Sequence, residues 1–350
     1  MQYTALNRLA TLAVHEHINF EQAREFLHEA SKVAERNNDM TGLGETEWNI
    51  AQLSFYQLDM NSVIEHGTRA LQLARQLGQM ELIARSLNVI ASGKKESGCW
   101  SEAEVCAEEA LALYKELGNR AMEADCLCLL ASIFLNTGRT RDGISVARAA
   151  YTMSQEVENA WGQANGSYHL AVGAMETGAY TEALELAQQC ISIAHAEALL
   201  SWQGLGLILQ GTIFRAMLAL DEARTAHLKA FEFYQNVKIP ALIQMVSFEL
   251  CADFAMTAIW DKAHIYALQA LATDEYYILL STRLAHWYET EALVHGGEIE
   301  RATHDVQYFG QRIGSSRRYR IPYLRALAVL AHQRDELEQA IEHLLDAGQL

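Results

Sequence analysis

Small side chains return along this chain at a fixed interval of 40 residues. The first series of such positions is Ala23, Val63, Ala103, Gly143, Ala183, Ala223 and Ala263, followed by Ala302 and Ala340 at spacings of 39 and 38. A second series lies seven residues after the first (Ala30, Ala70, Ala110), and a third lies twelve residues before it (Thr11, Ala51, Ala91). A period this long and regular is typical of a repeat array, so it constrains the architecture more than any other feature.

Residues 81–120 give the content of one repeat. Apolar residues recur there with helical spacing in two stripes, which are separated by Gly98 and closed by Gly118. We therefore predict two helices per repeat, with Ser101 as the N-cap of the second and Gly118 just past its end. The segments lack the period-two alternation of strands.

Small residues at regular positions allow two helices to approach to the short end of the usual 8–10 Å interaxial range. We expect Ala91 on the first helix to face Ala103 on the second, with Ala110 leaving room for the next repeat. The two prolines, Pro240 and Pro322, are predicted to lie in the first turn of a helix, where a missing N–H costs nothing.

This pattern of small residues, with a bulky residue three positions ahead of the first series (Met60, Trp100, Tyr180), resembles the tetratricopeptide repeat (TPR). The standard unit of that family has 34 residues. The 40-residue unit here is similar to the longer variant in the sensor arms of MalT-type bacterial signalling ATPases, in LGN/Pins adaptors and, in a close form, in kinesin light chains. The resemblance implies an all-α, right-handed superhelical solenoid of helix-turn-helix repeats, working as a scaffold.

We expect one array that occupies the whole chain and belongs to a larger protein. Its nine predicted repeats are 1–40, 41–80, 81–120, 121–160, 161–200, 201–240, 241–279, 280–318 and 319–350. Because the repeats consume the chain, no room is left for a separate catalytic domain.

Composition excludes several classes of partner. The formal net charge is −17, with 44 acidic residues against 27 basic ones, which disfavours nucleic-acid binding. We expect most acids on the solvated outer faces of helices. No segment reaches the roughly 20 apolar residues that span a bilayer, and residues 1–17 are amphipathic instead of forming the apolar core of a signal peptide. The six cysteines lie at helix positions, Cys190 and Cys251 at small-residue sites, which favours a cytoplasmic protein without disulfides.

No motif for catalysis, metal or cofactor stands out. The chain has no phosphate loop, HExxH, GxSxG or zinc-type cysteine pair, and Cys126 and Cys128 would point to different sides of a helix. We therefore predict no enzymatic activity and no cofactor.

The concave groove of such a solenoid is lined by the first helix of each repeat. Counting in register gives a polar set, Trp48, Arg85, Asn88, Asn165 and Tyr168, in which amides would hold a peptide backbone and aromatic rings would anchor side chains. Further on, Leu205, Ile208, Met245, Phe248 and Trp287 form an apolar set that suits a hydrophobic helix or a lid. For Leu205, Ile208 and Phe248, packing in the core is the favoured interpretation. The leading hypothesis is a peptide- or protein-binding arm of a signalling or regulatory protein.

Two alternatives stay open. The MalT resemblance implies a small-molecule effector domain, in which Trp48, Phe55, Tyr56 and Tyr168 would stack a sugar. Separately, Arg317, Arg318 and Arg320 interrupt the acidic background and suit an anion or an acidic segment of the parent protein. The competing interpretation of these arginines is a solvated loop.

Overall fold

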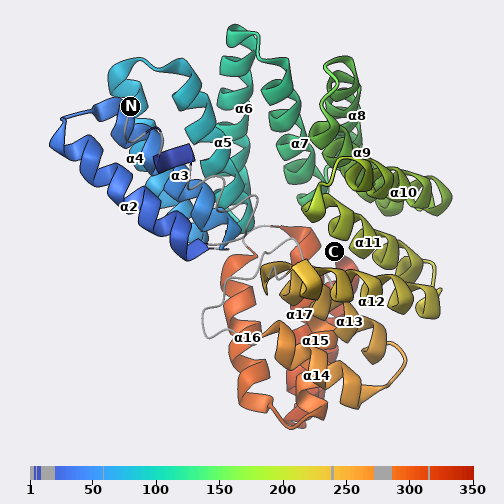
Figure 1. The fold of residues 1–350 in the computed structure, drawn as a ribbon. Coiled ribbons are helices and arrows are strands. Elements are labelled where there is room, and N and C mark those ends of the chain that lie inside the picture. Colours follow the sequence, from blue (N-terminus) through green and yellow to red (C-terminus); the bar gives the residue numbers. More distant parts are fainter. Residues whose placement is uncertain are drawn as a thin grey trace. The chain divides into compact units, whose positions relative to one another are not determined.

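The computed structural model describes residues 4, 6–8, 20–57, 59–237, 240–271, 286–313 and 316–350, and every regular element in these ranges is an α-helix (Figure 1). The first helices of successive hairpins are α3 (Met40–Tyr56), α5 (Met80–Glu96), α7 (Arg120–Asn136), α9 (Ala160–Glu176), α11 (Leu200–Ala216), α13 (Pro240–Ala255), α15 (His286–His295) and α17 (Arg317–Gln333). The second helices are α2 (Phe20–Arg36), α4 (Met60–Leu77), α6 (Trp100–Leu117), α8 (Thr140–Glu156), α10 (Tyr180–Ala196), α12 (Leu220–Val237), α14 (Trp260–Ala270), α16 (Ile299–Arg312) and α18 (Leu337–Gln349). The prediction of an all-helical solenoid is confirmed.

Tight turns with one left-handed residue separate the helices. Gly98 has φ +79° and Gly118 has φ +66°, as the sequence predicted for residues that end a helix. The prediction for Ser101 is wrong, because α6 begins at Trp100 and its N-cap is Cys99. The turn leaves no room for a later start, since the Cys99 amide already bonds the Lys94 carbonyl at 2.9 Å.

The two prolines differ. Pro240 opens α13, as predicted. Pro322 is the sixth residue of α17 and lies beyond its first turn, so that prediction is wrong. The reason is the register: α17 begins eleven residues before the small residue Ala328, as α5 begins eleven before Ala91. Pro322 therefore falls where the Arg318 carbonyl would find its intrahelical donor, and it lacks the N–H to supply it.

The periodic small residues form the seams between helices. Every member of the first series is buried, from Ala23 to Ala340, and so is every described member of the third. Thr11 lies outside the described residues. In the second series only Ala347, in the final helix, is partly exposed. Burial of these positions explains the strict period, because a larger side chain there would push neighbouring helices apart.

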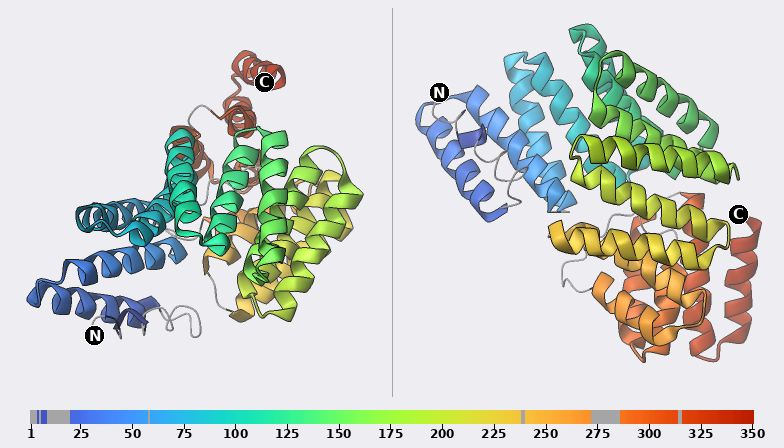
Figure 2. Two further views of the ribbon diagram at one scale, coloured as in Figure 1. Left: turned by 90° about the horizontal axis from the view of Figure 1, so that it is seen from above. Right: turned by 45° about the vertical axis from the view of Figure 1, so that its right-hand side comes forward.

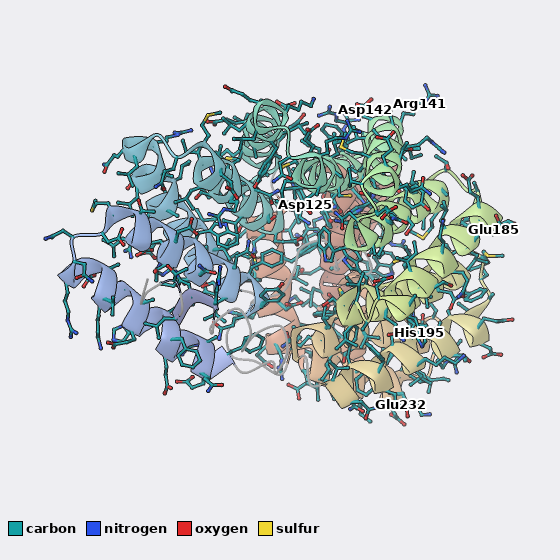
Figure 3. The ribbon with its side chains drawn as sticks, turned by 45° about the horizontal axis from the view of Figure 1, so that its top comes forward. Asp125, Arg141, Asp142, Glu185, His195 and Glu232 are labelled. Carbon is teal, nitrogen blue, oxygen red and sulfur yellow. The ribbon has the colours of Figure 1, made fainter. Side chains whose placement is uncertain are left out.

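The chain divides into two compact units within α7, residues Met1–Ile133 and Phe134–Leu350. Each unit is a stack of helical hairpins in which consecutive helices lie side by side (Figure 2). In the second unit, charged residues of the second helices lie on the outside, as Arg141, Asp142, Glu185 and Glu232 do in Figure 3. This placement agrees with the predicted solvated outer face.

Candidate functional site

Three of the predicted groove residues lie together in the first unit. The Trp48 indole on α3 donates from Nε1 to the Arg85 carbonyl on α5 at 3.3 Å. The Arg85 guanidinium lies 4.6 Å from the centre of the Trp48 ring, a cation–π distance. Arg85 also pairs with Glu45 at 2.5 Å. Neighbouring repeats therefore already satisfy much of the bonding capacity of Trp48 and Arg85.

Asn88, one turn after Arg85, binds the next repeat. Its Nδ2 donates to Asp125 Oδ2 on α7 at 3.1 Å and to the Cys126 sulfur at 3.2 Å. Burial raises the pKa of Asp125 from its ordinary 3.8 to about 6, and the hydrogen bond from Asn88 offsets this only in part. The first unit thus carries a carboxyl group whose charge is costly at neutral pH.

The other two predicted residues, Asn165 and Tyr168, lie one turn apart on α9 in the second unit. Tyr168 packs against Trp202 of α11 with ring centres 5.6 Å apart, and Trp202 meets Trp161 at 5.5 Å. Trp161 is 42% exposed. Because Trp161, Asn165 and Tyr168 are spaced by four and three residues, they share one face of α9.

Asn165 is the residue of this face that the fold leaves unsatisfied. Its side chain is only 6% exposed, and within the described residues its Oδ1 atom has no hydrogen-bond partner. A buried acceptor without a donor costs about 1–3 kcal/mol. Buried polar atoms without a hydrogen-bond partner are rare in folded proteins, and one that faces a binding surface is available to a ligand that supplies the donor.

The sequence analysis missed Trp161 and Trp202. The register contained the signal for Trp202: the matching positions are Gly42, Leu82, Met122, Gly162 and Leu242, so a tryptophan there is an exception. The prediction of core packing is confirmed for Ile208 and Phe248, which are 5% and 6% exposed in core clusters. Leu205 is only partly buried and packs against the cluster that contains Ile208.

A buried network of charges in the second unit was also missed. Arg215 on α11 pairs with Asp253, at 3.0 Å, and with Glu249, both on α13. His227 on α12 places Nδ1 at 2.6 Å from Asp253 and Nε2 at 3.0 Å from the Ile208 carbonyl. An imidazolium donates to both acceptors, whereas a neutral ring donates to only one.

Charge balance makes this network stable in the core. Burial acts to raise the pKa of Asp253, but the charges and hydrogen bonds of His227 and Arg215 outweigh it and hold the pKa below its ordinary value. The register again contained the signal. His227 replaces Ala107, Ala147, Ala187 and Ala267 of other repeats, and Gly211 opposite it replaces an alanine.

The arginines near the start of α17 differ in surroundings. Arg318 is largely buried and pairs with Glu176 at 2.6 Å, whereas Arg317 and Arg320 are exposed. Of the residues in the alternative sugar site, Phe55 is half-buried and Tyr56 is 39% exposed at the end of α3.

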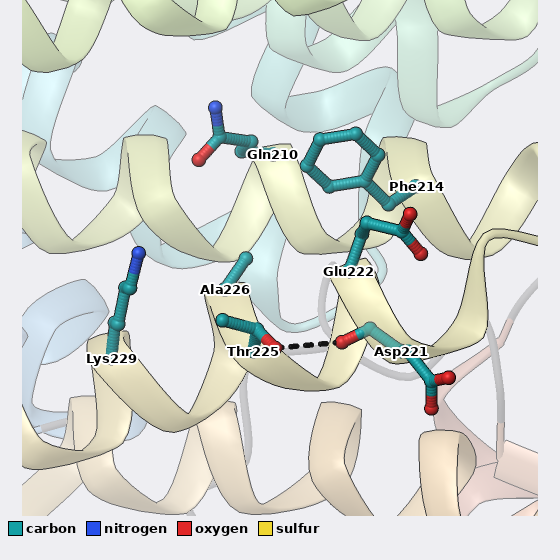
Figure 4. Close-up of a pocket in the computed structure, with 7 residues that line it drawn as sticks. All are labelled: Gln210, Phe214, Asp221, Glu222, Thr225, Ala226 and Lys229. Atoms are coloured by element: carbon teal, nitrogen blue, oxygen red, sulfur yellow. Dashed lines mark hydrogen bonds between the residues drawn. The ribbon is translucent and has the colours of Figure 1, made fainter.

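Other chemistry was sought among the described residues. They contain no group of three or more His, Cys, Asp or Glu side chains that could hold a metal ion. An open depression between α11 and α12 is lined by Gln210, Phe214, Asp221, Glu222, Thr225, Ala226 and Lys229 (Figure 4). The Thr225 hydroxyl donates to the Asp221 backbone carbonyl at 2.8 Å, so its proton is engaged within α12. In the part of the chain that the structure describes, no helix is long and apolar enough to cross a membrane.

The sequence matches no protein-family model and no curated protein. Solved structures resemble the fold at low identity. A Rap protein complexed with Competence and Sporulation Factor is 12% identical with a TM-score of 0.68, over 99% of this chain and 97% of that one. Aspartyl phosphate phosphatase F from Bacillus subtilis is 15% identical, with a TM-score of 0.54 over 99% and 93%.

A further similar structure is a STAND signal-transduction ATPase with a tetratricopeptide repeat sensor, from Pyrococcus horikoshii. It is 14% identical with a TM-score of 0.55, over 99% of this chain and 53% of that one. These likenesses establish a TPR-like helical repeat fold.

Proposed function

We propose that the chain is a non-catalytic recognition module that binds a peptide or protein segment, and that it serves as the sensor or interaction arm of a signalling or regulatory protein. All 350 residues would form one array of nine repeats within a larger protein. The similarity to a Rap protein solved with Competence and Sporulation Factor, and to an ATPase with a TPR sensor, supports this role.

The proposal rests on the side-chain Oδ1 atom of Asn165, which has no hydrogen-bond donor within the described residues. Asn165 shares a face of α9 with Trp161 and Tyr168, whose rings both pack on Trp202. A peptide backbone offers N–H donors at regular intervals, and its apolar side chains pack well on aromatic rings. A rotation of the Asn165 side chain would bring Oδ1 to such a donor. In the first unit, Trp48, Arg85 and Asn88 would contribute a second contact region, after exchange of their present bonds.

The test is selection of peptides from a displayed random library on the full chain. We expect peptides that bind the wild type and lose about fivefold in affinity on Asn165→Ala or Tyr168→Ala, because a hydrogen bond between neutral groups and an aromatic contact each contribute about 1 kcal/mol. Asn165→Ala should also keep or raise the stability of the free protein, since it removes a buried unsatisfied group. Glu185→Ala, on the exposed face of α10, is the matched control.

Peptides that bind wild type and both groove variants equally would rule out this face of α9. Failure to select any peptide, together with thermal stabilisation by a low-mass fraction, would favour the small-molecule alternative. The aromatic rings around Asn165 suit a flat or cyclic ligand of that kind.

A further inference from the structure

The beginning of α17 is bonded to the end of α7, although 180 to 183 residues separate the bonded pairs. Ser316 Oγ donates to the Asn136 carbonyl at 3.3 Å, and Arg318 Nη1 donates to the Leu135 carbonyl at 2.8 Å. Tyr319 Oη donates to Asn136 Oδ1 at 2.6 Å. All of these residues belong to the second unit.

The contact is well built. Tyr319 is fully buried and Ser316 is 6% exposed. The last carbonyls of a helix have no partner inside it, and cationic side chains are favoured there. Arg318 supplies α7 with both a donor for its Leu135 carbonyl and a positive charge at its carboxyl end. In a simple repeat array each repeat contacts its neighbours only. The hydrogen bonds between hairpins four and nine are therefore an additional contact that joins the two ends of the second unit.

The contact between α17 and α7 is held by hydrogen bonds and an ion pair, which can break and re-form. Arg318 Nη2 pairs with Glu176 Oε1, at the end of α9, at 2.6 Å, and the two side chains are 14% and 29% exposed. Ion pairs near the surface contribute little to stability, because water screens the two charges. The hairpins on both sides have their own buried seams, so the contact can open without their unfolding.

The surroundings of Arg318 favour negative partners. Arg317 and Arg320 are exposed and form no ion pair within the described residues. Both lie at the start of α17, where the helix dipole adds positive potential. The group that Arg318 now binds is a carboxylate, which indicates the chemistry of a competitor.

We propose that the first turn of α17 is a latch on the end of α7, and that an acidic peptide segment opens it by displacing Glu176 from Arg318 while Arg317 and Arg320 hold the segment. Opening the latch would separate hairpins four and nine and change the curvature of the second unit. This proposal does not depend on peptide binding at Asn165.

Hydrogen exchange of the full chain tests the latch. We expect Arg318→Ala to speed exchange about fivefold or more in two distant segments, residues 134–138 and 316–320, which corresponds to the loss of about 1 kcal/mol. Arg148→Ala, at an exposed position of α8, is the control and should leave both segments unchanged. Faster exchange in 316–320 alone would overturn the proposal, because the two segments would then not be in contact.

A short poly-glutamate peptide tests the opening. In the wild type we expect it to speed exchange in both segments, and a poly-glutamine peptide of equal length to have no effect. Arg317→Ala/Arg320→Ala should weaken the response. No response, or the same response to sodium chloride at equal ionic strength, would overturn the proposed opening. An equal response to inorganic phosphate would assign the site to simple anions and overturn the peptide.

Discussion

Asp125 is a single residue whose burial lowers the stability of the folded state at neutral pH. It lies on the first helix of its repeat, where the equivalent residues of neighbouring repeats are Arg85 and Asn165. The surrounding helices remove much of its hydration, and within the described residues its side-chain hydrogen bond comes from the Asn88 amide rather than from a cation. In Figure 3 it lies on α7, among the helices of the first unit. The result is a carboxyl group with a pKa of about 6.

We predict that Asp125→Asn stabilises the protein at pH 7.5, by an amount on the order of 2 kcal/mol. The folded pKa lies above the ordinary value of 3.8, so the folded state binds the proton first as the pH falls. The wild type should therefore gain stability relative to the variant between about pH 6 and pH 4. Urea unfolding at several pH values measures this difference.

The exposed Glu185→Gln is the control for that experiment and should track the wild type. A constant difference between Asp125→Asn and the wild type from pH 4 to pH 7.5 would mean that Asp125 titrates normally.

At the scale of helices, the packing seams depend on matched pairs of small residues. The third, fourth and fifth repeats have alanine at both of these positions, as with Ala131 and Ala147. In the sixth repeat the pair becomes Gly211 and His227. A Cβ atom at position 211 would lie 2.5 Å from the His227 ring, so the glycine makes room for the imidazole. The histidine is in turn fixed by Asp253 and the Ile208 carbonyl.

We predict that Gly211→Ala lowers the free energy of unfolding by about 1–3 kcal/mol, because the ring cannot move without losing a hydrogen bond. Chemical denaturation measures the change. Gly348→Ala, in α18, has no neighbour within 4 Å and should be neutral or slightly stabilising. A Gly211→Ala variant as stable as the wild type would indicate that His227 is free to shift.

At the scale of the molecule, stacked hairpins pass strain mainly to their neighbours. The boundary between the two units falls inside α7, between Ile133 and Phe134. In arrays of this kind, stability is close to a sum of repeat and interface contributions. Local damage should therefore stay local.

We predict that Ala91→Leu, at a fully buried position of α5, costs about 1–3 kcal/mol by overpacking and speeds hydrogen exchange in α4 to α6 while α11 to α14 keep their protection. Glu108→Leu, on the exposed face of α6, controls for the added leucine. An equal loss of protection in both units would contradict this and indicate that the chain unfolds as one cooperative body.

The repeat period was enough to predict the helices and their seams. Local spacing determines which face of a helix is apolar, and Gly98 and Gly118 mark where helices must end, so these features need no distant information. Exceptions to the register were readable in principle too: Trp202 and His227 stand out against the small or aliphatic residues at equivalent positions. The placement of Ser101 and Pro322 went wrong because it depended on where each helix starts.

The sequence by itself determined the all-helical repeat fold, because the 40-residue period indicates a repeat array and the helical spacing of apolar residues within each unit indicates a pair of helices. Only the tertiary structure decided which polar residues are satisfied. Asn88 donates to Asp125 in the next repeat, and Arg318 donates to the Leu135 carbonyl at the end of α7, 183 residues away in the sequence. The side-chain Oδ1 atom of Asn165 has no hydrogen-bond donor within the described residues. A hydrogen bond between two helices requires its donor and acceptor atoms to lie within about 2.7–3.2 Å of each other, and a periodic sequence pattern does not encode positions that finely.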